Sequence, residues 1–155
     1  MSEISPVDKT ADRMEIEDLA RRYAHGIDGR QWDQVDSCFL PTAEVRGTAY
    51  SGPYPEYMGS LRGAVESYRT TMHFFGNQLT EVAGDTGHCV TYGIAYHLGS
   101  GTGSDFVIGV RYTDDVVRTD GRWVISGRVV EGVWRQPLGP PLGPAVTELS
   151  APAES

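Results

Sequence analysis

The sequence predicts a small α+β domain in which helices precede an antiparallel sheet. Apolar residues recur at helical spacing near the N-terminus, whereas apolar and polar residues alternate through the second half of the chain. Short turns containing Gly and Asp separate the alternating segments, as expected for hairpins. Helices grouped before long strands favour this class over a parallel, doubly wound sheet. The length of 155 residues suits a single domain with its own hydrophobic core.

The first helix is the clearest element of the sequence. Asp12 with Glu15 resembles a capping box at its start, and Gly29 is a typical stop just beyond its last turn. A short second helix is predicted over residues 32–39, and a third over about residues 55–70. The apolar residues of the first helix form one continuous stripe: Ile16, Leu19, Ala20, Tyr23, Ala24 and Ile27.

Strands and two tails fill the rest of the chain. We place the domain at residues 11–136, between an N-terminal tail of residues 1–11 and a Pro- and Gly-rich C-terminal tail of residues 137–155. The prolines exclude a helix or a central strand from the second tail. Its apolar residues favour packing, either along its own subunit or across to a neighbour. The predicted strands are residues 43–50, 72–82, 86–98, 105–118 and 122–134.

The charge and the missing motifs exclude several functions. The formal net charge is −8, with 13 basic and 21 acidic side chains and no basic cluster, so nucleic acid is not an expected partner. No apolar run reaches the roughly 18 residues of a membrane span, and the first residues lack the apolar segment of a secretory signal. We therefore expect a cytoplasmic protein with no membrane partner. Cys38 and Cys89 lack metal-binding or redox spacing, which favours two buried free thiols and no metal site.

Asp28 stands at the end of the first predicted helix, where the helix dipole places partial negative charge. A carboxylate there costs about 0.3 to 1 kcal/mol unless a neighbour offsets it. On a helical wheel Asp28 lies about 40° beyond Ala24, at the margin of the apolar stripe, so its side chain can point beneath the sheet. The alternative is a solvated aspartate that serves the following turn.

His73 falls where the third helix gives way to a strand. In an extended segment, His73, Phe75 and Asn77 share one face. An imidazole beside a carboxylate is a competent general base, because the carboxylate fixes its tautomer and stabilises the imidazolium. The alternative is a histidine satisfied within an aromatic core. His88 and His97 are weaker candidates, since they lie at opposite ends and on opposite faces of one predicted strand.

Four segments resemble the SnoaL-like branch of the NTF2-like proteins: residues 23–28, 32–39, 72–77 and 120–125. The similarity extends over roughly residues 11–136. It implies a cone-shaped α+β fold in which N-terminal helices pack on a strongly curved antiparallel or mixed sheet that encloses a pocket. Members include scytalone dehydratase, bile-acid 7α-dehydratase, hexachlorocyclohexane dehydrochlorinase, steroid isomerases and polyketide cyclases. The dehydratases and the dehydrochlorinase resemble this chain most.

The resemblance also implies a catalytic set. Such enzymes use an aspartate at the end of the first helix and a histidine on the strand after the third, which correspond here to Asp28 and His73. Arg128 matches an arginine on the last long strand, and Tyr23 matches a tyrosine of the bile-acid enzyme. Aromatic residues of the sheet fit a pocket, a core or a subunit interface. The expected pocket residues are Val45, Phe75, Asn77, Val90, Tyr92, Ile108, Val130 and Trp134.

On these grounds we expect a cofactor-independent lyase, most simply a dehydratase, for a hydrophobic polyketide-, steroid- or terpenoid-like molecule. His73, held by Asp28, would remove a proton from a carbon beside an activating group. An isomerase or cyclase begins with the same proton abstraction, and the fold also suits a non-catalytic protein that binds a hydrophobic ligand. The resemblance further implies a homo-oligomer, either trimer or dimer, packed through the sheet.

Overall fold

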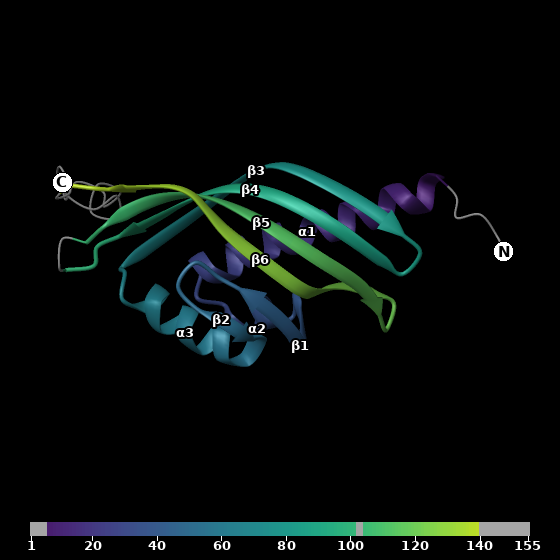
Figure 1. Ribbon diagram of the computed structural model, residues 1–155, viewed down its shortest axis with the longest axis horizontal. Coiled ribbons are helices and arrows are strands. Elements are labelled where there is room, and N and C mark those ends of the chain that lie inside the picture. Colours follow the sequence, from purple (N-terminus) through teal and green to yellow (C-terminus); the bar gives the residue numbers. More distant parts are fainter. Residues whose placement is uncertain (1–5, 102–103, 140–155) are drawn as a thin grey trace, which may run out of the picture.

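The computed structural model describes residues 6–101 and 104–139, which form helices packed against a curved, unclosed sheet (Figure 1). The first half of the chain contains α1 (Pro6–Asp28), α2 (Trp32–Asp36), β1 (Phe39–Arg46), β2 (Ser51–Pro53) and α3 (Tyr54–Glu66). The second half contains β3 (Thr70–Ala83), β4 (Thr86–Leu98), β5 (Phe106–Thr119) and β6 (Arg122–Pro137). Helices before long strands confirm the predicted α+β class.

The sheet is mixed rather than purely antiparallel. Its six strands follow the order β2-β1-β6-β5-β4-β3, so the four long strands form a meander and β1 joins the sheet beside the last of them. The β1–β6 pair is parallel, with Val45 opposite Arg128, and every other pair is antiparallel. Register shifts interrupt β3 between Phe75 and Gln78, and β6 where it pairs with Gly109–Val110 and with Asp115–Val116. Such bulges increase the local twist and bend the strands.

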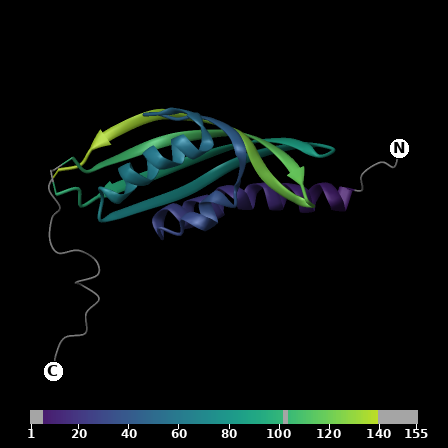
Figure 2. The ribbon, with the colours of Figure 1, turned by 90° about the horizontal axis from the view of Figure 1, so that it is seen from below.

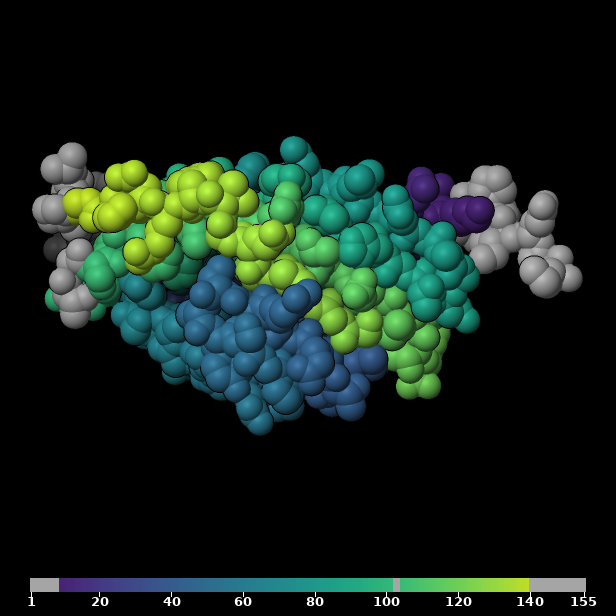
Figure 3. Space-filling view, viewed as in Figure 1, coloured from purple at the N-terminus to yellow at the C-terminus, as the bar shows by residue number. Residues whose placement is uncertain are grey.

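The helices lie on one face of the curved sheet, and β1 and β2 continue the sheet beyond β6. Helix α1 packs along β3, whereas α3 packs on β1 (Figure 2). In the space-filling view, α3, β1 and β2 form a continuous layer beneath β6 (Figure 3). We call the sheet face toward α1 the inner face and the opposite one the outer face. Cores of this kind form where an apolar helix stripe covers one face of a sheet.

Helix α1 begins earlier than the sequence predicts. It starts at Pro6, so Asp12 lies inside the helix and does not cap it. The buried carboxylate of Asp12 instead accepts hydrogen bonds from Arg118 Nη2 at 2.6 Å and from Trp123 Nε1 at 3.1 Å. These bonds hold its pKa below the usual value, although burial acts to raise it. The predicted capping box is therefore wrong, because a tertiary contact uses the side chain that resembled a cap.

The predicted stripe of α1 is buried as expected, whereas the next element is shorter than predicted. Helix α2 ends at Asp36, and Phe39 already belongs to β1. Phe39 is buried and its ring stacks on Tyr54 at a centroid distance of 4.4 Å. The last strand runs on to Pro137. Most of the predicted C-terminal tail, residues 140–155, lies outside the described residues.

Candidate active site

Asp28 and His73 meet where the end of α1 touches the start of β3. Asp28 Oδ1 lies 2.7 Å from His73 Nδ1, and Asp28 Oδ2 accepts the His73 backbone N–H, also at 2.7 Å. The His73 side chain is only 6% exposed, whereas that of Asp28 is 25% exposed. An acceptor at Nδ1 selects the tautomer with a proton on that nitrogen, which leaves Nε2 as the basic atom.

The hydrogen bonds around Asp28 keep it ionised. Burial acts to raise the pKa of the carboxyl, but the bonds from the His73 ring and backbone and from Thr71 outweigh it, so the pKa lies below its usual value. Thr71 Oγ1 donates to Asp28 Oδ1 at 2.9 Å. A negative charge at a helix C-terminus is therefore offset by three donors, which is the compensation that this position requires.

Aromatic rings surround His73 on the inner face. Tyr23 from α1 and Phe75 from β3 make edge contacts with the imidazole at centroid distances of 6.4 and 6.1 Å. His97 from β4 makes a third, at 6.0 Å. Burial lowers the pKa of His97 to about 4, assisted by the nearby His73, so His97 is neutral at pH 7. His97 itself stacks on Phe106 at 4.3 Å.

A buried ion pair lies deeper on the same face. Arg128 Nε and Nη2 donate to the two oxygens of Asp114 at 2.7 and 2.8 Å, and the side chains are 0% and 4% exposed. The guanidinium carbon lies 4.4 Å from the Tyr23 ring centroid, with the Phe39 and Tyr112 rings also near. Burial acts to lower the pKa of Arg128, but Asp114 raises it above the usual value. Nη1 has no hydrogen-bond partner among the described residues.

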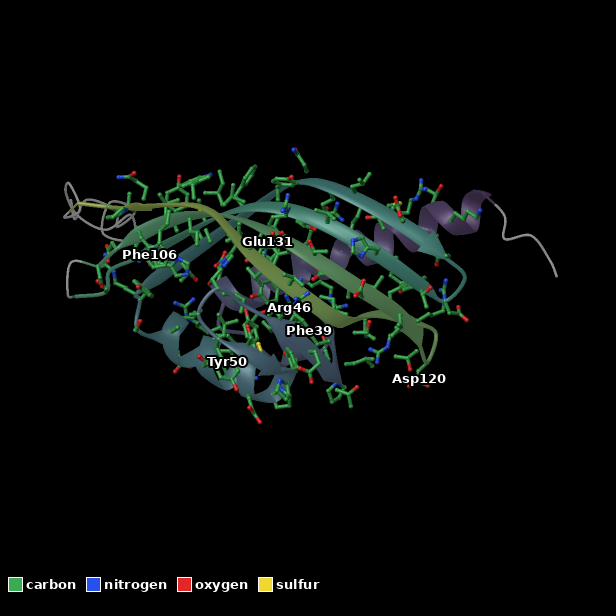
Figure 4. The ribbon with its side chains drawn as sticks, viewed as in Figure 1. Phe39, Arg46, Tyr50, Phe106, Asp120 and Glu131 are labelled. Atoms are coloured by element: carbon green, nitrogen blue, oxygen red, sulfur yellow. The ribbon has the colours of Figure 1, made fainter. Side chains whose placement is uncertain are left out.

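The structure brings together Asp28, His73 and Tyr23, and the Arg128 guanidinium lies over the Tyr23 ring. Phe39 and Phe106 lie on the helix side of the sheet, as does this cluster (Figure 4). Burial raises the pKa of the Tyr23 phenol well above its usual value, so it stays protonated. Four expected pocket residues contact the same interior: Val45, Phe75, Ile108 and Val130.

The remaining expected pocket residues lie on the outer face, away from the Asp28–His73 pair. Val90 and Tyr92 pair with Thr113 and Arg111, whereas the inner-face partners on these strands are Thr91 and Tyr112. A pocket of about 240 Å³ occupies the outer face. It is lined by Asn77, Tyr92 and Trp134, together with Phe74, Ile94 and Val133. Trp134 lies directly over Gly109, where any Cβ would collide with the indole.

Several residues of the site were not singled out by the sequence. His97 was only a weaker candidate from the sequence, because its ring neighbours come from β3, β5 and the segment before β3. Asp114 carried no signal beyond an acidic residue in a strand. Arg30 lies in the turn after α1 and Thr71 near the start of β3; both contact Asp28, and neither belongs to a recognisable motif. In each case the contact depends on how the strands pair or on where the chain turns back, and local sequence patterns encode neither.

The Asp28–His73 cluster described above includes no cysteine. Both cysteines are free and buried, and burial raises the pKa of each thiol. Over the described ranges, no three His, Cys, Asp or Glu side chains converge as metal ligands would. None of the helices in the described part of the chain is long and apolar enough to cross a bilayer.

Comparison with known proteins places the chain among related domains. A family model for the SnoaL-like domain matches residues 8–129. An uncharacterised protein of Mycobacterium tuberculosis is 31% identical over 127 residues, covering 79% of this chain and 86% of the relative. The structure of a hexachlorocyclohexane dehydrochlorinase of type 2 has a TM-score of 0.79 at 25% identity, covering 90% of this chain and 98% of that one.

Two further solved structures show the same fold. The dehydrochlorinase of type 3 from Novosphingobium barchaimii has a TM-score of 0.80 at 23% identity, covering 91% of this chain and all of that one. A scytalone dehydratase-like protein from Novosphingobium aromaticivorans has a TM-score of 0.76 at 20% identity, covering 88% of this chain and 97% of that one.

Proposed function

The chain belongs to the SnoaL-like domain family, and from that premise we propose that it is a lyase, most simply a dehydratase, for a hydrophobic small molecule. The observation that carries the proposal is the Asp28–His73 contact at 2.7 Å on a face lined with aromatic rings. A purely structural histidine needs no buried carboxylate, whereas a general base benefits from one. The neighbouring dehydrochlorinases and the dehydratase-like protein carry lyase names, which supports the same reaction class.

In the proposed reaction, His73 Nε2 takes a proton from a carbon beside a carbonyl or another activating group. The electrons of the broken C–H bond form a C=C bond while the C–O bond to the leaving hydroxyl breaks. The departing hydroxide takes this proton back from His73 Nε2 and leaves as water, so the imidazole returns to its neutral form. Asp28 stabilises the imidazolium that forms on His73. A positioned base of this kind contributes about 10²- to 10⁴-fold to the rate.

Tyr23 and Arg128 would stabilise the negative charge that develops on the substrate oxygen. Tyr23 stays protonated because burial raises its pKa, so its hydroxyl, which lies beside Tyr57, would turn to donate to an oxyanion or to the leaving oxygen. Arg128 keeps its proton and acts only through its charge and its N–H groups. Its Nη1, which lacks a partner among the described residues, is the atom we assign to the substrate. The apolar walls from Phe75, Ile108 and Val130 favour a polyketide-, steroid- or terpenoid-like skeleton.

An isomerase or cyclase using the same pair is the principal alternative, because both begin with proton abstraction from carbon. Product analysis in heavy water separates the reactions, since isomerisation returns deuterium to the skeleton and dehydration removes oxygen from it. A ligand-binding protein without catalysis is favoured less, because nothing in passive binding requires Asp28 to orient His73.

The test is turnover of a panel of cyclic β-hydroxy ketones and chlorinated cyclohexanes by the wild type and two variants, Asp28→Asn and His73→Ala. We expect each variant to lose about 10²- to 10⁴-fold in kcat on any substrate that the wild type converts. His88→Ala is the matched control, because His88 also pairs with an aspartate, Asp115, but is 44% exposed at the other end of the sheet. If turnover survives in both Asp28→Asn and His73→Ala, His73 is not the general base.

We also propose that the outer face mediates self-association. Large apolar side chains are exposed there, among them Phe74 at 66%, Leu79 at 68% and Trp134 at 47%. Exposed apolar surface concentrated on one face of a small domain is typical of an interface. A homo-oligomer packed through this face would cover these residues and leave the Asp28–His73 pair on the opposite face unobstructed.

A further inference from the structure

Arg30 binds the segments that meet around Asp28. It lies two residues beyond Asp28 with φ of 56°, a left-handed conformation that few residues other than glycine adopt. This turn directs its guanidinium back beneath the end of α1. Nη1 donates to the carbonyl oxygens of Ile27 and Asp28 at 2.9 and 3.2 Å. Nη2 donates to the carbonyl oxygens of Val65 and Tyr68, at and just beyond the end of α3, at 3.2 and 3.1 Å.

The fifth hydrogen bond of Arg30 leads to the Asp28–His73 pair. Arg30 Nη1 lies 2.9 Å from Thr71 Oγ1, which in turn lies 2.9 Å from Asp28 Oδ1. A guanidinium can only donate, so the Thr71 oxygen must accept from Arg30. Its own hydroxyl proton is then directed at Asp28. The direction of both bonds follows from the chemistry of the groups.

We propose that Thr71 and Arg30 are positioning residues that set the orientation and the basicity of Asp28. Asp28 Oδ2 takes the backbone N–H of His73, while Oδ1 is shared between Thr71 Oγ1 and His73 Nδ1. With both oxygens occupied, the carboxylate has one orientation, and that orientation fixes His73. The Thr71 hydroxyl also withdraws electron density from Oδ1, which weakens its acceptance of the His73 Nδ1–H.

Helix capping alone is the competing explanation for Arg30. A cation at two helix C-termini is favourable in itself, and four of its five acceptors are backbone carbonyls. Capping, however, does not require Thr71. Thr71 is buried, and its hydroxyl lies between a guanidinium and a carboxylate. A positioning role needs this hydroxyl and capping does not, so the decisive variant is at Thr71.

Several other charged or titratable groups lie near His73, and a test of Thr71 must leave them unchanged. Tyr23 faces it from α1 and His97 from β4, and Tyr112 on β5 contacts Phe75, the inner-face neighbour of His73 on β3. Arg135 on β6 lies over Phe106, which stacks on His97. His97 lies opposite Thr71 in the β3–β4 pair, but among the described residues the Thr71 hydroxyl bonds only to Arg30 and Asp28, so its removal by Thr71→Val acts first on Asp28.

The experiment is NMR of the imidazole N–H proton at His73 Nδ1 in the wild type, Thr71→Val and Thr71→Ser. Valine keeps the shape of threonine without its hydroxyl, whereas serine keeps the hydroxyl. In Thr71→Val the carboxylate becomes the stronger acceptor, so the resonance should move downfield. The pKa of Asp28 should rise, since one donor to the carboxylate is lost. Thr71→Ser should resemble the wild type in both measurements.

A structural role for Thr71 predicts the opposite sign. If the substitution merely loosens the pair, the resonance moves upfield or disappears through exchange with water, and this result would overturn the proposal. An unmoved resonance in folded Thr71→Val would overturn it as well. Arg30→Gln supplies a second variant, for which we expect a smaller downfield shift because Thr71 keeps its place but loses the cation. The inference concerns the pair used in the proposed function, but the readout needs no turnover, so either can fail alone.

Discussion

The Asp114–Arg128 pair allows a prediction that needs no substrate. In Asp114→Asn, the volume at position 114 hardly changes and one acceptor oxygen remains, but the buried guanidinium loses its counter-charge. Two hydrogen bonds at 2.7 and 2.8 Å join the wild-type side chains, which are 4% and 0% exposed. Losing one charge-assisted bond and stranding a buried cation should cost about 3 kcal/mol, at the low end of what breaking a buried pair costs.

Urea unfolding followed by tryptophan fluorescence measures this cost. With a slope of about 2 kcal/mol per molar urea, 3 kcal/mol lowers the midpoint by about 1.5 M. In a thermal melt the same loss lowers Tm by roughly 6 to 12 °C. Glu131→Gln is the matched control, because the Arg111–Glu131 pair is exposed on the outer face and should contribute less than about 1 kcal/mol.

A double variant separates charge from packing. Asp114→Leu with Arg128→Met replaces the pair by apolar side chains, and such replacements of buried pairs are often neutral or stabilising. We expect the double variant to be more stable than Asp114→Asn. A cost below about 1 kcal/mol for Asp114→Asn, or a double variant no more stable than the single one, would show that the counter-charge of Arg128 contributes little.

Two further predictions concern the buried His97 and the exposed outer face. Because the folded state lowers the pKa of His97 to about 4, the unfolded chain binds more protons between about pH 4 and 6.5, so wild-type stability should fall as the pH is lowered through this window. His97→Phe should show a weaker fall in urea titrations at pH 7, 5.5 and 4.5, and parallel curves would contradict the burial of a neutral imidazole. On the outer face, Phe74→Glu should lower the molar mass seen by light scattering if copies associate there, while Glu81→Gln serves as the control; an unchanged mass would argue against that interface.

The sequence predicted the Asp28–His73 contact better than the faces of the other expected site residues. Asp28 and His73 stood out individually, one by its place at a helix end and the other by its aromatic surroundings, and the structure brings them into contact. His97 was underestimated because a histidine in a strand acquires its meaning from the residues opposite it. Its stacking partner, Phe106, lies on the next strand and depends on the register of the β4–β5 hairpin.

Assignment of residues to faces failed for a related reason. Alternation shows that Val90 and Tyr92 share a face, but not which face carries the helices, because both faces of β4 are rich in apolar side chains. Trp134 is harder still, since a register shift separates the Gly109–Trp134 pair from the Val110–Gly132 pair. A bulge inserts one residue and reverses the facing of everything beyond it. The inner and outer sets therefore become known only once the strands are paired.

The bond from the His73 backbone to Asp28 links the Asp28–His73 pair to the border of the sheet. Strand β3 is the last in the order, so within the described residues it has a neighbouring strand, β4, on one side only. On its other side the His73 N–H is left for Asp28 Oδ2. An additional strand pairing there would compete for that N–H and displace the carboxylate. The pair thus requires a sheet that ends at β3, and the aspartate in turn shields a border position that is otherwise open to strand addition and aggregation.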